Sequence, residues 1–233
     1  MSAIFKREFK AYFASPLGYV IVSALAFFSA IFFSYMYTYG YADVAYIFSN
    51  MLVIVMFAVP ILTMRLMSEE RKQKTDQALF TAPVGLTSIV MGKFLAALSI
   101  FALGFAPTLI YQTVFSFKVS LNWLLYLSDL LGVLLYGAAL IAIGLFLSSL
   151  TESQVVAAVL GIVVSLLVGL MDNFASMINN EFLTGIISYI SFNGRYEAFA
   201  NGIIDFSNIV FFVSVAAAFI FLTVRSLEKK RWA

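Results

Sequence analysis

The residues that could support catalysis or nucleotide chemistry are few in this sequence. It contains no cysteine and no histidine, which excludes disulfides, thiolate nucleophiles, imidazole bases and zinc sites with Cys or His ligands. The dipeptide Gly92-Lys93 also occurs in phosphate-binding loops. Such a loop needs a glycine where this chain has Thr87, and Ser or Thr where it has Phe94. The chain therefore cannot hydrolyse nucleotide by that route.

The distribution of charge argues against ion-coupled transport. Only 11% of the 233 residues are charged, and the long apolar stretches are nearly free of them. Proton- or ion-coupled carriers usually place ionisable residues at the centre of such stretches. Asp129, near one end of an apolar stretch, is the one candidate, and we expect it to lie at the membrane interface. No polar or charged ring typical of an aqueous channel is evident.

The composition places most of the chain in lipid. Hydrophobic residues make up 63% of it, and the mean hydropathy is +1.00, whereas soluble domains carry roughly 25% charged residues. A chain this short cannot bury so much apolar surface away from water. We therefore expect an integral membrane protein with a single membrane domain.

The intervals between successive charged residues predict the membrane spans. A transmembrane helix needs about 20 apolar residues to cross roughly 30 Å of hydrocarbon. Helices are favoured because an isolated strand leaves its backbone unpaired in lipid, so we expect an all-α fold. Six charge-free intervals have at least 19 residues. They predict spans at about 17–39, 46–66, 88–116, 124–148, 153–171 and 207–226.

The positions of Lys and Arg predict the orientation. Six spans place both termini on one side of the membrane, and that side then holds twelve of the fourteen basic residues. Only Lys118 and Arg195 lie on the other side. Because basic residues accumulate in cytoplasmic segments, we predict that both termini are cytoplasmic.

Residues 2–14 precede the first span and predict an amphipathic helix in the membrane interface. At 100° per residue its apolar side chains share one face: Ile4, Phe5, Phe9, Tyr12 and Phe13. Glu8 falls inside that face, where a carboxylate facing lipid would be costly. We predict that Glu8 packs against protein and pairs with Arg71, Lys74 or Lys93. A simple membrane anchor is the alternative.

The loop over residues 65–94 is densely charged, contains an apolar trio at 78–80 and stops at Pro83 and Gly85. Ser68 is a candidate helix N-cap followed by two acids in the first turn. A solvated connector that orients the protein is one interpretation of this loop. An apolar trio between charged ends instead favours a docking surface for a partner that supplies energy.

The stretch 171–206 is too apolar for a free loop and too interrupted to cross the membrane twice. We expect a re-entrant helical hairpin or two half-helices, with Arg195 and Glu197 near an outer opening. A loosely folded external cap is the alternative.

Small residues recur at four-residue spacing in the fifth predicted span, which allows close helix approach. This stripe consists of Ser153, Ala157, Gly161, Ser165 and Gly169. Packing within the chain and packing between two subunits remain equally open.

The charged loop also carries a family resemblance. RLMSEERKQKTDQALFTAPVGLTSIVMGKFLAAL resembles the segment before the third span of ABC-2 type transporter permeases. The matching residues are Glu69, Glu70, Arg71, Lys72, Thr75, Asp76, Leu79, Phe80, Thr81, Pro83 and Thr87. The start, IFKREFKAYFASPLGYV, resembles the N-terminal elbow helix of the family, and the gliding-motility-type branch looks most similar. Many relatives have Gly where this chain has Lys74, so the bend at that point is not predicted.

The resemblance implies a permease domain over residues 1–233, with an elbow helix at 2–14, a coupling segment at 68–83 and an outer re-entrant segment at 171–206. Two permease subunits, identical or different, would pair with two cytoplasmic ATPase subunits. ATP and Mg would be bound by the ATPase, so this chain would hold no cofactor and would not be an enzyme by itself. The residues implied in ATPase coupling are Glu69, Glu70, Arg71, Lys74, Thr75, Asp76, Leu79, Phe80, Thr81 and Pro83.

The resemblance further implies an exporter in the bacterial cytoplasmic membrane whose partners are lipid, an ATPase and a second permease, not nucleic acid. Arg195 and Glu197 would lie at the outer gate, and spans two and five would line the pathway or the dimer interface. The transported substrate is not readable from the sequence. Two other functions stay open: a secondary transporter or channel without ATP, and a membrane scaffold without transport.

Overall fold

The computed structural model describes residues 2–39, 44–74, 85–117, 122–172, 185, 187 and 189–231. Every regular element within these ranges is a helix. The prediction of an all-α fold is therefore confirmed for the part of the chain that the structure describes.

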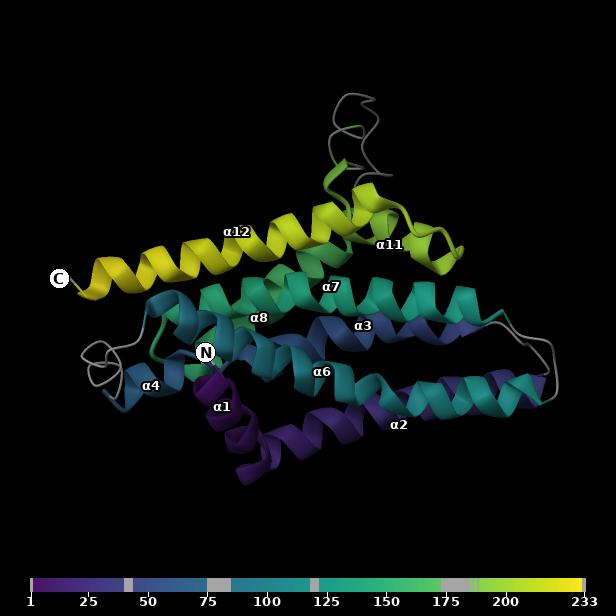
Figure 1. Cartoon of the computed structure of the whole chain (residues 1–233), viewed down its shortest axis with the longest axis horizontal. Coiled ribbons are helices and arrows are strands. Elements are labelled where there is room, and N and C mark those ends of the chain that lie inside the picture. Colours follow the sequence, from purple (N-terminus) through teal and green to yellow (C-terminus); the bar gives the residue numbers. More distant parts are fainter. Residues whose placement is uncertain are drawn as a thin grey trace.

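Five long helices run alongside one another and build the bundle (Figure 1). These are α2 (Pro16–Tyr39), α3 (Val44–Thr63), α6 (Leu86–Ser116), α7 (Trp123–Leu150) and α12 (Phe206–Arg231). Helix α7 is the central element, since it packs against α3, α6 and α12. Each of the five is long and apolar enough to cross a membrane, which confirms a multi-pass membrane protein.

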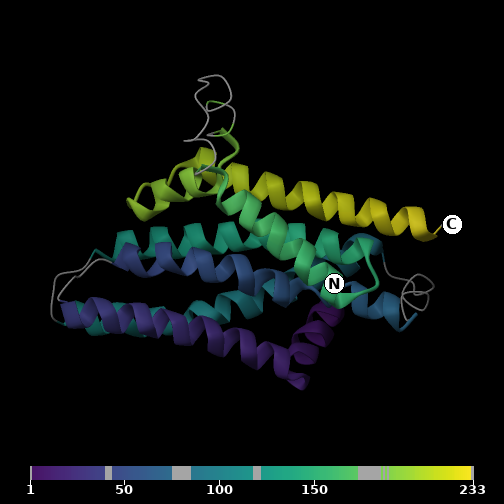
Figure 2. The same ribbon diagram turned by 180° about the vertical axis from the view of Figure 1, so that it is seen from behind.

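Helix α8 (Gln154–Gly169) occupies the fifth predicted span and has 16 residues. At 1.5 Å per residue it is about 24 Å long, shorter than a typical hydrocarbon core. Figure 2 shows it crossing obliquely over the bundle from the region of α11 towards the N-terminus. Among the described residues there are thus five helices of spanning length and a shorter apolar one, α8, at the position of the fifth predicted span.

The shorter helices gather at two places. Helices α1 (Ser2–Ala14) and α4 (Ser68–Lys72) lie at the same end of the bundle as the C-terminal end of α12 (Figure 1). We call this the charged end. Helix α11 (Phe192–Ala200) packs on α7 nearer the other end.

The small-residue stripe of α8 packs within the chain. Ala157, Gly161, Ser165 and Gly169 are buried, and α8 contacts α3 along this face. A Cβ added at Gly161 would lie 2.8 Å from Cβ of Pro60, so the absence of a side chain there permits the close crossing. Ser153 has a different role, because its side chain accepts a hydrogen bond from the backbone N–H of Val156 at the start of α8.

The outer segment is described in part. Residues 173–184, 186 and 188 lie outside the described residues, so the re-entrant path over 171–206 stays a prediction. Helix α11 buries Phe192, Tyr196 and Phe199, and Ser128 of α7 donates a hydrogen bond of 2.9 Å to the carbonyl of Phe199.

The side chain of Asp129 is buried between α7 and α11. Its predicted position at the membrane interface stays a prediction. The hydroxyl of Tyr196 donates to its Oδ1 at 3.3 Å. The residue that covers Asp129 is contributed by α11, far along the sequence.

Candidate functional site

Four charged side chains from three helices meet at the charged end. Lys93 of α6 places its Nζ 3.2 Å from Oε1 of Glu8 on α1 and 2.9 Å from Oε1 of Glu70 on α4. Arg7 of α1 contacts the same two oxygens, at 2.5 Å and 2.9 Å. We call Arg7, Glu8, Glu70 and Lys93 the four-charge cluster. It joins three helices that are well separated along the chain.

Three of the four side chains in the cluster are largely removed from solvent, whereas the side chain of Arg7 is 52% exposed. The side chain of Lys93 is 2% exposed, and those of Glu8 and Glu70 are 13% and 17% exposed. A buried ammonium is costly unless it is paired, and two carboxylates meet that need here. Burial acts to raise the pKa of Glu8, but the nearby charges of Lys93 and Arg7 outweigh it, so this pKa is lowered overall. Two cations and two anions leave the cluster neutral.

The local fold explains why Lys93 reaches Glu8. Its neighbour Gly92 has no side chain, and a Cβ there would lie 2.8 Å from Cγ2 of Ile4. Helix α1 can therefore lie close against the start of α6. Of the three cations that the sequence offered for Glu8, the structure places Lys93 beside it. Arg71 lies instead 3.3 Å from Glu152, and Lys74, two residues after α4, adopts a left-handed backbone with φ of 55°.

A second set of contacts fixes the end of α1 to the end of α3. Arg65 donates to the carbonyl of Ala11 at 3.0 Å and to Oγ of Ser15 at 2.6 Å. Its guanidinium lies 4.9 Å from the ring centre of Tyr12. The buried hydroxyl of Tyr12 in turn donates to the carbonyl of Leu62 at 2.8 Å. Helix α1 is thus attached to the bundle by polar contacts as well as by its apolar face.

The junction between α3 and α4 rests on the end of α7. Ser148 accepts hydrogen bonds from the backbone N–H groups of Met67 and Ser68, both at 3.1 Å, and donates to the carbonyl of Met64 at 3.0 Å. Arg71 donates to the carbonyl of Ser149 at 3.1 Å. The orphan backbone groups at a helix start need such partners, and here another helix provides them.

The predicted cap at Ser68 is wrong. Met67 occupies the N-cap position of α4 without a side-chain cap, and the hydroxyl of Ser68 donates back to the carbonyl of Met64. The role that we assigned to Ser68 belongs to Ser148, which a local motif could not reveal.

The residues implied in ATPase coupling are only partly described. Glu69, Glu70, Arg71 and Lys74 lie in or next to α4, where Glu69 sits 3.7 Å from Arg65. The other predicted members lie outside the described residues: Thr75, Asp76, Leu79, Phe80, Thr81 and Pro83. Their predicted role stays a prediction.

The two predicted gate residues point in different directions. Arg195 faces α12, where it donates to Oδ1 of Asn208 at 3.0 Å and lies 5.0 Å from the ring centre of Phe211. Glu197 lines a cavity of about 520 Å³ together with Asp172, which follows α8, and with residues of α3 and α11. The structure therefore does not bring the two side chains together.

Residues that the sequence did not single out complete the site. Ser148 and Ser149 form a polar pair at the end of an apolar helix. This pair is the feature of the sequence from which their role could have been predicted. Arg65 was counted only as a topology marker. No group of His, Asp or Glu among the described residues could hold a metal ion.

Comparison with known proteins identifies the family. A search of curated proteins finds no match. A family model described as ABC-2 family transporter protein matches residues 32–227. The match begins within α2, so it does not test the resemblance of α1 to an elbow helix, and it does not test the gliding-motility branch. It covers most of the chain and every helix from α3 to α11. The chain belongs to the ABC-2 family of transporter proteins.

Proposed function

We propose that this chain is the membrane subunit of an ATP-driven exporter and that α4 transmits the movement of a separate ATPase to the bundle. Family membership supports the transport role. The observation that carries the coupling role is the four-charge cluster, because it connects Glu70 of α4 to α1 and α6 at once.

The geometry supports a stiff connection between α4 and the bundle. Residues 75–83, which the family resemblance assigns to the coupling helix, are separated from the end of α4 by two residues. Any displacement of α4 must carry Glu70 with it. Because a buried ion pair is expensive to break, α1 and the start of α6 would move with Glu70. Arg71 links the same helix to the end of α7 through Ser149 and Glu152.

The proposal assigns the charged end to the cytoplasm of a bacterial cell, on the basis of the Lys and Arg distribution. Both termini would then be cytoplasmic. ATP and Mg would be bound by the ATPase subunit, and a second permease, identical or different, would complete the pathway. The assignments of ATPase and second permease apply to this chain what the family resemblance implies.

Co-purification from the native membrane tests the proposal. A tagged chain should bring down an ATP-binding subunit, and transport in reconstituted vesicles should require it. Replacing Leu79 and Phe80 with Asp should abolish the association while leaving membrane insertion intact.

A charge introduced at Phe117 is the matched control, because this residue is 90% exposed at the opposite end of the bundle. Phe117→Asp should keep the association. Normal complex yield in the Leu79/Phe80 variant would contradict the coupling assignment, and transport without any ATPase would favour a secondary transporter.

A further inference from the structure

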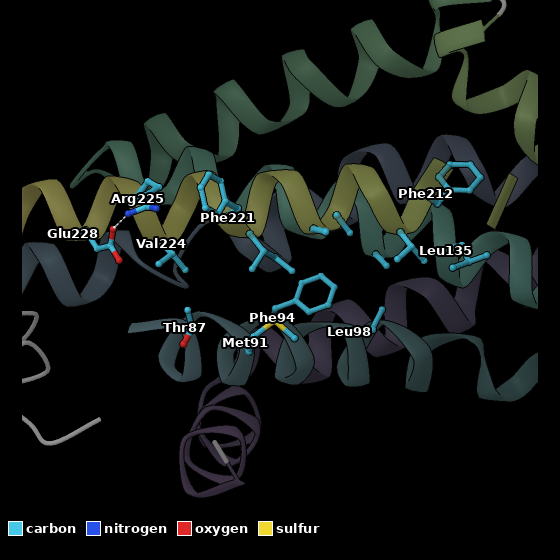
Figure 3. Close-up of a pocket in the computed structure, with 15 residues that line it drawn as sticks. Thr87, Met91, Phe94, Leu98, Leu135, Phe212, Phe221, Val224, Arg225 and Glu228 are labelled. Carbon is cyan, nitrogen blue, oxygen red and sulfur yellow. Dashed lines mark hydrogen bonds and ion pairs between the residues drawn. The ribbon is translucent and has the colours of Figure 1, made fainter. Parts of the chain in front are cut away.

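An apolar groove of about 730 Å³ lies between α6 and α12, with α7 as its floor. Figure 3 shows Met91, Phe94 and Leu98 of α6 facing the side chains of α12 across it. Val213 and Phe221 on the α12 side are 52% and 55% exposed. The groove is therefore open to the hydrocarbon that surrounds the bundle.

The lining of the groove is apolar along most of its length and charged at one end, like an amphiphile. From Phe212 and Leu135 to Val224 its lining is apolar. Among the described residues that line it, the two charged ones, Arg225 and Glu228, lie together at the charged end of the bundle (Figure 3). A ligand that fits this arrangement has a long apolar part and one polar head at the charged end.

The groove is long enough to span the hydrocarbon of one membrane leaflet. Phe212 and Arg225 are 13 positions apart on one helix, which corresponds to about 20 Å at 1.5 Å per residue. Half of a hydrocarbon core is about 15 Å thick. The groove therefore extends from the headgroup level past the depth of an acyl chain.

Arg225 is positioned to bind a phosphate. Its Nη1 lies 2.6 Å from Oε2 of Glu228, and its guanidinium lies 5.0 Å from the ring centre of Phe221. These contacts hold the group at the end of the groove. A guanidinium has five N–H donors, so the pairing with Glu228 leaves donors for a phosphate, which Arg binds well.

We propose that this groove binds one phospholipid of the leaflet at the charged end. An acyl chain lies between α6 and α12, and the phosphate binds Arg225. Unfilled apolar volume forfeits dispersion contacts along its whole lining, and an acyl chain restores them. The inference depends on the membrane location of the chain and is independent of the proposed ATPase.

A pair of adjacent alanines gives a matched test. Both alanines are exposed, but Ala217 lines the groove and Ala218 lies outside the lining. The full chain is purified in detergent and titrated with dioleoyl phosphatidylglycerol, with bound lipid measured by native mass spectrometry. The wild type and Ala218→Trp should bind one lipid per chain tightly. Ala217→Trp should lose most of this binding, because the indole occupies the groove.

The headgroup contact is tested in the same assay. Arg225→Gln removes a charge-assisted hydrogen bond and should weaken phosphatidylglycerol binding about tenfold, while Lys229→Gln, outside the lining, should bind as the wild type. Dioleoylglycerol, which lacks the phosphate, should bind the wild type and Arg225→Gln equally weakly.

Three results would overturn the inference. Ala217→Trp could bind lipid as well as Ala218→Trp. Dioleoylglycerol could bind the wild type as tightly as the phospholipid. Ala217→Trp could change the oligomeric state with lipid binding intact, which would assign the groove to a second copy of the chain.

Discussion

Nζ of Lys93 lies 2.9 Å from Oε1 of Glu70, and this pair joins the start of α6 to the short helix that follows α3. Lys93 belongs to a helix whose composition is otherwise that of a membrane span. Its side chain turns to the carboxylates of α1 and α4. Helices α1 and α4 and the start of α6 are therefore one connected structure, and this connection can be measured.

The pair is expected to be energetically coupled. Lys93→Met leaves Glu8 and Glu70 with Arg7 as their remaining cation in the cluster, and it should destabilise the fold by up to about 3 kcal/mol. Glu70→Gln should destabilise it less, because the amide can still accept a hydrogen bond. In the double variant the losses should not add, with an interaction term of about 0.5–3 kcal/mol. Thermal unfolding in detergent measures each value, and strict additivity would show that the pair is not coupled.

Acidic pH should weaken the attachment of α1 to the bundle, because Glu8 becomes protonated. Its folded pKa lies below the reference value of 4.5, so the unfolded chain binds more protons in the interval between the two values. The stabilisation from Glu8 is present above about pH 4.5 and is lost as the pH falls through the lowered folded pKa. Glu8→Gln should be less stable at neutral pH and should show a flatter decline in acid. An equally steep decline in both proteins would assign the pH dependence to other carboxylates.

The sequence predicted the need of Glu8 for a partner but not the partner itself. A carboxylate inside an apolar helical face signals an ion pair, and three cations were within reach along the chain. The choice of Lys93 depends on Gly92, which lets Ile4 approach α6, and that fit exists only in the folded bundle. Charge-free intervals likewise predicted the long helices, because span length is set by the membrane and not by neighbouring helices.

Other features depended on contacts that sequence spacing does not encode. Small residues at four-residue intervals suit packing against α3 and packing against another subunit equally well, and the position of Pro60 decides between them. The burial of Asp129 depends on Tyr196, 67 residues away. Ser148 supports Met67 and Ser68 across a similar separation. In each case a tertiary partner determines the role of the residue.

The crossing of α3 and α8 should tolerate no side chain at Gly161. An alanine there would place its Cβ 2.8 Å from Cβ of Pro60, and a proline ring cannot rotate away. Gly161→Ala should therefore cost about 1–3 kcal/mol through overpacking. Gly85→Ala is the matched control, because its nearest atom would be Oγ1 of Thr87 at 3.7 Å and its φ of −66° suits alanine. Unfolding temperatures of the two variants should differ clearly, and equal values would contradict the packing argument.

Gln112 of α6 is expected to reduce stability. Its side chain is 1% exposed, and neither its amide nitrogen nor its amide oxygen has a hydrogen-bond partner among the described residues. Leaving a buried polar group unsatisfied costs about 1–3 kcal/mol, so Gln112→Met, which keeps a similar length, should raise the unfolding temperature. Gln112→Glu should lower it, because a buried charge is costlier than a buried amide. A Gln112→Met variant that unfolds at a lower temperature than the wild type would contradict this prediction. It would mean that the amide has a hydrogen-bond partner in the membrane-embedded protein, and a bound water would be the first candidate.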